Sequence, residues 1–217
     1  DVYKRQIMLM EKFRGFPGWH IECSAMSQAL LPHTDIHTGG EDNAFPHHEC
    51  EIAQNECSHG YHIPVWMHAK HLLVDGKKMS KSKGNFFTIR DLVAKGYTGA
   101  EIRYALIAAH YRTALNFTED SLIQARGSIA RLQEAHRLIE SECEAEPDQN
   151  KSRESALVSQ ARTNYQAALN DDLNVAEALS TVFDLVAEAL KKKETKTLNA
   201  DEALLVVEFL EQDFNDV

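Results

Sequence analysis

The feature that most constrains the fold is a change in the spacing of apolar residues near residue 88. Before it, short apolar runs at 63–67 and 72–74, bounded by Pro or Gly, predict short buried strands. Helical stretches are predicted before these strands, over about 22–31 and 47–56. Strands that alternate with helices indicate part of a parallel α/β sheet.

Beyond Thr88 the apolar residues recur at helical spacing. Thr98 and Glu101 form a capping-box pattern, which predicts the start of a helix. Further helices are predicted over the following residues: roughly 120–140, 154–169, 175–193 and from 201 onward, with a polar loop at 141–153. We therefore expect an α/β part followed by an all-α bundle.

Composition excludes several classes of protein. No apolar run approaches the roughly 20 residues of a membrane span, and no secretory signal is visible. Four irregularly spaced cysteines in 217 residues do not form the pattern of a disulfide framework, which predicts a reducing, cytoplasmic setting. The first residue is Asp, so we treat the chain as a possible piece of a longer protein.

The net charge of −10 is unevenly distributed along the chain. Residues 119–217 carry 21 acidic and 10 basic side chains, whereas residues 1–118 carry 12 and 13. This acidic balance argues against indiscriminate nucleic-acid binding, although a local basic patch can still bind an RNA partner.

The most specific motif is the run from Lys78 to Ser82, KMSKS, followed by Lys-Gly-Asn. Two lysines three residues apart in a loop of small polar residues can surround a triphosphate and stabilise the charge that develops on pyrophosphate. An isolated K-x-x-K pattern is usually only a solvated basic loop. The interpretation as a triphosphate-binding loop therefore depends on the complete string KMSKS before Gly-Asn.

Cys23, His47 and Glu51 form a second candidate site. His47 and Glu51 are spaced i, i+4, so both side chains share one face of a helix. A thiolate, an imidazole and a carboxylate suit zinc but supply only three ligands. From spacing alone, the commoner explanation is that His47 and Glu51 form a surface pair and that Cys23 is a core residue.

Five strings, in their order along the chain, resemble the cysteinyl-tRNA synthetases, a class I aminoacyl-tRNA synthetase family. They are GWHIECSAM (18–26), DIHTGGED (35–42), FPHHECE (45–51), WMH (66–68) and KMSKS. The resemblance continues through residues 85–116 and reaches NDDLN at 170–174. Two positions depart from the family pattern, Thr38 in place of a third Gly and Cys50 in place of Asn. Cys50 competes with Glu51 as a ligand, and we prefer Glu51 because the family pattern aligns there.

The resemblance implies a zinc ion held by two Cys, one His and one Glu, which binds the substrate thiolate. Cys23, His47 and Glu51 match three of these ligands; the fourth, and the family's HIGH motif, would precede this chain. Because zinc prefers a thiolate to a hydroxyl, this contact would separate cysteine from serine without an editing site.

The resemblance also assigns the ATP and cysteine sites. Lys78 and Lys81 are the implied catalytic residues, placing the triphosphate. Trp19 and His37 would line the cysteine pocket. The implied ATP-binding residues are Gly39, Gly40, Asp42, Lys78, Met79, Ser80, Lys81 and Ser82.

The implied function is ATP-dependent activation of L-cysteine, with Mg²⁺, and its transfer to tRNA(Cys) by a cytoplasmic enzyme, with a monomer favoured. The expected domains are a Rossmann-like catalytic part (1–90), a helical stem-contact region (91–118) and a DALR-like helical tRNA-binding domain (119–217). We expect this chain by itself to be inactive or very weak. The alternatives are a mycothiol-type cysteine ligase, and a non-catalytic truncated paralogue that acts as a binding module.

Overall fold

The computed structural model describes residues 18–31, 33–80, 84–143 and 154–214. The chain divides into two compact units, residues 1–71 and 72–217, and each is described by itself. Within the described ranges, no helix combines the length and the apolar composition that crossing a membrane requires.

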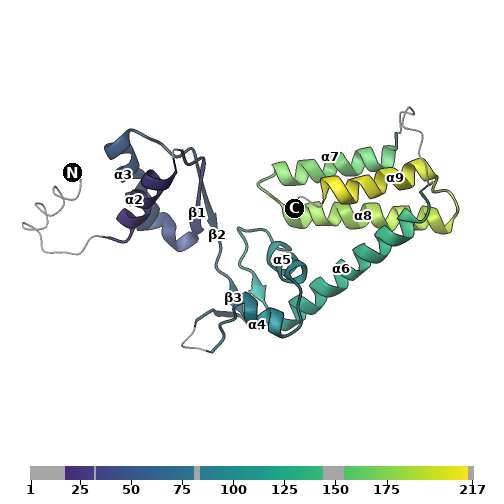
Figure 1. Ribbon diagram of the computed structural model, residues 1–217, viewed down its shortest axis with the longest axis horizontal. Helices are drawn as coiled ribbons and strands as arrows, with labels where there is room; N and C mark the ends of the chain where they lie inside the picture. Colours follow the sequence, from purple (N-terminus) through teal and green to yellow (C-terminus); the bar gives the residue numbers. More distant parts are fainter. Residues whose placement is uncertain (1–17, 32, 81–83, 144–153, 215–217) are drawn as a thin grey trace, which may run out of the picture. The chain divides into compact units, whose positions relative to one another are not determined.

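The described residues of the first unit form two parallel strands and two α-helices (Figure 1). Its elements are α2 (His20–Leu30), β1 (Ile36–Gly40), α3 (Glu49–His59) and β2 (Val65–Ala69). β1 pairs with β2 so that His37 lies opposite Trp66 and Gly39 opposite His68. Because parallel strands need a crossover, α3 and the irregular turn before it, Ala44–His48, connect them.

Polar contacts hold α2 against α3. Ser24 Oγ donates to Gln54 Oε1 at 2.7 Å, and Gln28 Nε2 donates to Asn55 Oδ1 at 2.6 Å. Gly60 ends α3 in the left-handed conformation, with φ of 63°, which glycine adopts without steric cost. The helix that was predicted from residue 47 therefore begins at residue 49 and runs three residues further than predicted.

The sheet of this unit differs from the sequence prediction. β2 begins two residues later than predicted, and the expectation of a buried strand is wrong, because Val65 is 48% exposed and Ile36 of β1 is 59% exposed. Among the described residues this sheet has only two strands, so nothing covers these side chains. β1 was not predicted, since its Gly-rich sequence has low strand propensity.

The second unit opens with a small sheet in the order β4-β3-β5. Its strands are β3 (Leu73–Val74), β4 (Lys77–Lys78) and β5 (Asn116–Phe117). Asp75 and Gly76 both have positive φ, the backbone of a tight two-residue hairpin turn between β3 and β4. The predicted strand at 72–74 is confirmed, and it places Lys78 at the end of the hairpin.

The remaining elements are helices, and those predicted are confirmed to within about two residues at each end. They are α4 (Ile89–Ala94), α5 (Gly99–Ile107), α6 (Glu119–Glu140), α7 (Ala156–Asn170), α8 (Val175–Glu194) and α9 (Ala200–Glu208). Thr88, Thr98 and Thr118 each cap a helix by accepting a hydrogen bond from the third residue of that helix. Most of the predicted loop at 141–153 lies outside the described residues.

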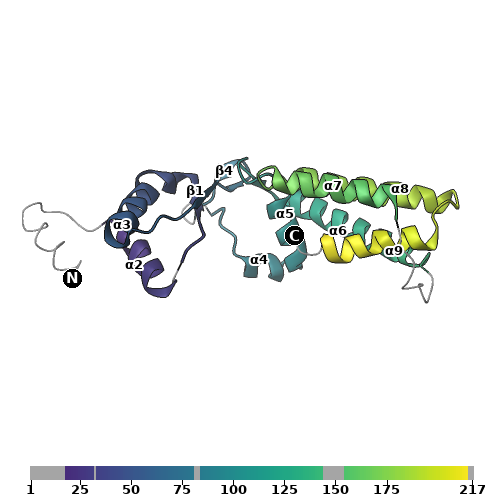
Figure 2. The same cartoon turned by 90° about the horizontal axis from the view of Figure 1, so that it is seen from above.

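One long helix, α6, takes part in two hydrophobic cores. Leu122 and Ala125 in its first half pack with α4, α5 and β5, whereas Ala135 and Ile139 in its second half pack with α7, α8 and α9. Both views show α7, α8 and α9 side by side, with α6 running into this bundle (Figure 1, Figure 2). The second half of α6 therefore belongs to a bundle with α7, α8 and α9, and its first half belongs to a smaller core with α4, α5 and β5.

Candidate metal and nucleotide site

Cys23, His47 and Glu51 come together in the first unit, and their ligand atoms all lie within 4.8 Å of one another. Cys23 lies on α2 and Glu51 on α3, while His47 precedes α3 by two residues. The helical spacing brings Nε2 of His47 to 2.8 Å from Oε1 of Glu51. The arrangement supplies one soft thiol and two harder donors around one point.

Glu51 is fully buried, and neither of its carboxylate oxygens accepts a hydrogen bond from any described residue. Burial raises the pKa of Glu51 to about 7. Burial, and then the charge of Glu51, also raises the pKa of the Cys23 thiol. A buried carboxylate without donors is costly unless a cation balances it, so the donor set fits a metal ion.

Trp19 and His37 lie next to this group. The ring centroids of Trp19 and His47 are 4.1 Å apart, and Trp19 remains 62% exposed. His37 projects from β1 so that Nε2 lies 3.4 Å from Oε2 of Glu51, and its ring stacks on Trp66 at 4.5 Å. Burial, followed by the charge of His47, lowers the pKa of His37.

Two further histidines belong to the cluster and were not singled out from the sequence. Nδ1 of His48 lies 2.7 Å from Nε2 of His68, and His48 is buried. Burial, followed by the charges of neighbouring histidines, lowers the pKa of His48 to about 4, so its ring is neutral. The sequence did contain one signal for His48, because it directly follows His47. Consecutive residues of a helix point in different directions, so His48 cannot lie on the face that His47 shares with Glu51.

The other cysteines lie outside these groups. Cys50 is half-buried on α3 and belongs to neither candidate metal group, while Cys57 is exposed. Glu51, by contrast, belongs to both candidate groups, and its choice over Cys50 stays a prediction.

The predicted adenosine-binding residues lie at the carboxyl end of β1. Gly39 and Gly40 are its last residues, and Asp42 follows in a short helical turn, Glu41–Asn43. The Asp42 side chain is exposed, with Oδ1 3.9 Å from Nε2 of His71. In α/β proteins ligands bind outside the carboxyl ends of parallel strands, which is where these residues lie.

The motif that was predicted to bind phosphate begins in the second unit. Lys78 is exposed in β4, and Met79 and Ser80 are half-buried. Asn85 closes the loop, because its Oδ1 accepts from Ser80 N at 2.9 Å and its Nδ2 donates to Lys78 O at 3.3 Å. Lys81 and Ser82 lie outside the described residues.

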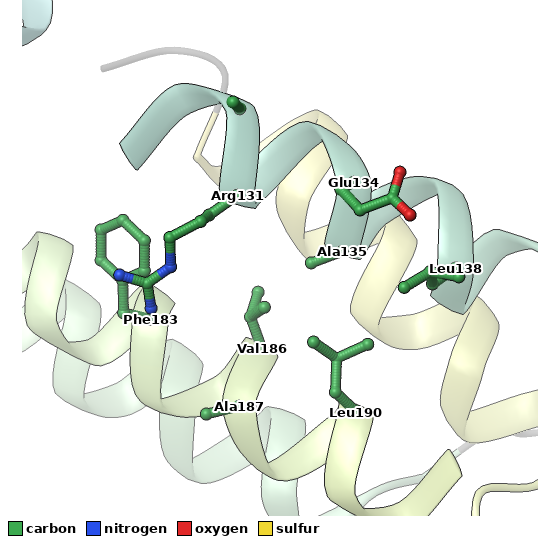
Figure 3. A pocket seen from close by; sticks show the side chains of 9 residues that line it. Arg131, Glu134, Ala135, Leu138, Phe183, Val186, Ala187 and Leu190 are labelled. Atoms are coloured by element: carbon green, nitrogen blue, oxygen red, sulfur yellow. The ribbon is translucent and has the colours of Figure 1, made fainter. Parts of the chain in front are cut away.

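A separate cavity of about 450 Å³ lies between α6 and α8 (Figure 3). Its lining is apolar except for Arg131, which faces the ring of Phe183 at 5.2 Å, and Glu134, which pairs with Arg137. Both charged groups are thus already engaged. The cavity offers no metal-binding or acid–base cluster, and the chemistry of the described residues concentrates around Glu51.

Comparison with known proteins agrees with this reading. The family model of tRNA synthetases class I (C) catalytic domains matches residues 12–127, just over half of the chain, and that of the DALR domain matches residues 164–215. A cysteine–tRNA ligase of Protochlamydia amoebophila is 45% identical over 200 residues, which is 91% of this chain and 41% of the relative. One from Chlamydia abortus is 48% identical over 183 residues, covering 80% of this chain and 37% of the relative. The chain thus spans about two fifths of the length of these relatives.

Solved structures show the same fold at low sequence identity. A LeuRS of Agrobacterium radiobacter, in a ternary complex with tRNA and LeuAMS, matches 80% of this chain and 25% of its own, with a TM-score of 0.59 and 16% identity. A putative arginyl-tRNA synthetase of Campylobacter jejuni matches 89% of this chain and 48% of its own, with a TM-score of 0.50 and 16% identity. Fold, family models and relatives agree: the chain belongs to the class I (C) tRNA synthetases and joins part of their catalytic domain to a DALR helical domain.

Proposed function

We propose that this chain is part of a cysteine–tRNA ligase, which activates L-cysteine with ATP and transfers it to tRNA(Cys). The observation that carries the proposal is the group of half-buried Cys23 with buried His47 and Glu51, beside the exposed ring of Trp19. Relatives that are called cysteine–tRNA ligases support it over most of the chain.

Cys23, His47 and Glu51 would hold one zinc ion. The zinc would supply a soft Lewis acid that prefers a thiolate to a hydroxyl, which is the difference between cysteine and serine. Glu51 offers an oxygen that needs a cation, and Cys23 offers the sulfur. Trp19 and His37 flank these ligands and would contact the bound amino acid.

The end of β1 in the first unit and the lysine-rich loop in the second unit each carry residues that would bind ATP. Gly39 and Gly40 would lie under the adenosine, and Asp42 would accept hydrogen bonds from ribose hydroxyls. Lys78 and Lys81 would neutralise the triphosphate, with Mg²⁺, as pyrophosphate leaves. The side chain of Asn85 holds Lys78 and Ser80 at the start of this loop. Met79, Ser80 and Ser82 would complete the ATP site.

The helical part would contact the tRNA. We propose the division into a catalytic part (1–90), a stem-contact region (91–118) and a tRNA-binding helical domain (119–217). The lysines near the end of α8 do not form an open basic patch, because Lys191, Lys192 and Lys193 pair with Glu188, Glu202 and Glu142. RNA binding would thus use other basic residues of this domain.

The proposal is tested by loading the purified chain with Co²⁺, which substitutes for zinc and absorbs visible light. L-cysteine should increase the thiolate-to-cobalt absorption, and L-serine at the same concentration should leave it unchanged. Cys23→Ser should reduce metal binding sharply, whereas Cys57→Ser, at an exposed cysteine of the same unit, should not. Equal responses to cysteine and serine would contradict the proposal.

Activity assays separate the alternatives. ATP–pyrophosphate exchange by the 217-residue chain should be absent or very weak. In a version extended to the length of the relatives, exchange and tRNA charging are expected. Turnover that depends on an amino-sugar acceptor would instead indicate the mycothiol-type ligase, and thiol binding without any adenylate formation in the extended version would indicate a binding module.

A further inference from the structure

An ion pair joins the two chain segments that leave the carboxyl ends of β1 and β2. Gly40 pairs with Ala69 in the last step of this parallel sheet. The next residue of each segment is charged, Glu41 after β1 and Lys70 after β2. Neighbouring strands lie about 4.8 Å apart, and Nζ of Lys70 donates a hydrogen bond to Oε2 of Glu41 across this gap. The register of the sheet therefore brings the two charges together.

The pair holds the short helical turn Glu41–Asn43, which carries the proposed ribose-binding residue Asp42. The hydrogen bond from Lys70 is the main cause that lowers the pKa of Glu41, and the charge of Lys70 and the backbone N–H of His71 lower it further. Glu41 thus accepts hydrogen bonds from two consecutive residues after β2. One carboxylate therefore ties the turn after β1 to the segment after β2.

The carboxylate of Asp42 keeps room for a ligand in this arrangement. Its side chain is 59% exposed, and its Oδ1 lies 3.9 Å from Nε2 of His71, which is beyond hydrogen-bond distance. A Cβ atom at position 40 would lie 2.6 Å from the same Oδ1, so the missing side chain of Gly40 lets the carboxylate lie at the end of β1. Because Lys70 pairs with Glu41, its ammonium group does not occupy the neighbouring Asp42.

We propose that Lys70 is a positioning residue for the nucleotide: its ion pair with Glu41 fixes the turn Glu41–Asn43 so that Asp42 can accept hydrogen bonds from the ribose hydroxyls. The inference rests on the proposed function, from which it takes the ribose contact of Asp42. Lys70 acts through Glu41 and not on the nucleotide, so its effect depends on the ribose hydroxyls. An exposed ion pair contributes little to the stability of a fold, so removing this one should leave the unit folded.

The test compares the binding of AMP and of 2′,3′-dideoxy-AMP to the full 217-residue chain by NMR titration. AMP contains the adenosine but lacks the β- and γ-phosphates that the lysine-rich loop would bind. Lys70→Met should weaken AMP binding about two- to fivefold, which is the effect of losing one exposed ion pair. The same variant should leave the weaker binding of the dideoxy nucleotide unchanged. Asp42→Asn should likewise weaken the binding of AMP alone.

Two variants serve as controls. Lys70→Arg keeps a cation that can pair with Glu41, so it should bind AMP as the wild type does. Glu56→Gln removes another exposed ion pair of the same unit, between Glu56 in the last turn of α3 and His62, and should change the binding of neither nucleotide. In the free chain, Lys70→Met should shift the amide resonances of the turn Glu41–Asn43, while those of α2 keep their wild-type positions.

The contrary outcomes separate this inference from the proposed function. AMP binding that Asp42→Asn weakens and Lys70→Met leaves unchanged would overturn the role of the ion pair and leave the ribose contact intact. Equal losses for both nucleotides in Lys70→Met would show that Lys70 acts on another part of the nucleotide or on the fold, and would also overturn the inference. If AMP did not bind, or if Asp42→Asn bound it like the wild type, the ribose contact and the inference would both be wrong. The cobalt response to cysteine would still decide the cysteine site.

Discussion

At the scale of single residues, the contact between Gly39 and His48 makes the sharpest prediction. In Gly39→Ala the new methyl group would lie 2.6 Å from the imidazole of His48, which is held by His68 on its other side. We expect the variant to lose about 1–3 kcal/mol of stability, as overpacked sites do. Chemical denaturation, followed by a signal from the first unit, measures this loss.

Gly127→Ala is the matched control. Gly127 lies in the middle of α6, and a Cβ there would meet nothing within 4 Å. Because glycine is a poor helix former, this variant should gain about 0.5–1 kcal/mol. If Gly39→Ala were as stable as the wild type, the close packing of His48 on β1 would be wrong.

The spacing of residues predicted part of this cluster. An i, i+4 pattern on a helix is enough to place His47 and Glu51 on one face, and the structure has them 2.8 Å apart. Spacing does not reveal that Glu51 is fully buried, because burial depends on residues distant in sequence, such as Cys23 of α2 and His37 of β1, that lie close to it. His48 and His68 are 20 residues apart, and His68 lies opposite Gly39, against which His48 packs.

At the scale of elements, a charged contact joins α5 to α6 beside their shared hydrophobic core. Glu101 in the first turn of α5 accepts from Nε of Arg126 on α6 at 2.7 Å and from the backbone N–H of Thr98 at 2.8 Å. The hydrogen bond from Arg126, followed by that from Thr98, lowers the pKa of Glu101 to about 2. The ionised form therefore stabilises the folded state.

This shift fixes the direction of a pH dependence. The folded pKa lies below the usual value of 4.5, so the contribution is complete above about pH 4.5 and is lost as pH falls toward 2. Thermal melting between pH 6 and pH 2.5 should show a smaller decrease of Tm in Glu101→Gln than in the wild type. Identical decreases would mean that the contact contributes nothing to stability.

The second half of α6 belongs to the larger core, and Ile139 is fully buried there. Ile139→Ala should cost about 2–5 kcal/mol, because it removes buried methyl groups and leaves a cavity. Ile123, on the same helix but 55% exposed, gives the control, since Ile123→Ala should change stability by less than about 1 kcal/mol. Equal losses in urea denaturation would contradict the assignment of Ile139 to the core.

Elements with strong local signals were predicted better than those without. Thr98 and Glu101 predicted the start of α5, and both capping hydrogen bonds are present. β1 has no comparable signal: its sequence IHTGG forms a strand only because β2 lies beside it. A helix cap is determined by a few neighbouring residues, whereas strand pairing depends on residues about 30 positions away.

At the scale of the whole molecule, the two units differ in what stabilises them. Both hydrophobic cores belong to residues 72–217. Among the described residues of the first unit, Ile63 is the one fully buried apolar side chain, and the other buried residues are Ser24, His47, His48, Glu51 and Asn55. A unit with so small an apolar core usually needs a metal or other covering structure to be stable.

Metal removal should therefore affect the two units differently. If the histidine and cysteine ligands bind metal, the ion stabilises the first unit by mass action, because the unfolded chain has no preformed site. Chelation with EDTA should increase amide hydrogen exchange in α2, α3, β1 and β2 by tenfold or more, while α6 to α9 keep their protection. Hydrogen–deuterium exchange of the whole chain, with and without added Zn²⁺, measures this difference peptide by peptide.

Exchange that chelation leaves unchanged in the first unit would show that polar contacts such as Ser24–Gln54 are sufficient to hold α2 against α3. An equal increase in both units would contradict the expectation that the helical core is stable independently of the first unit.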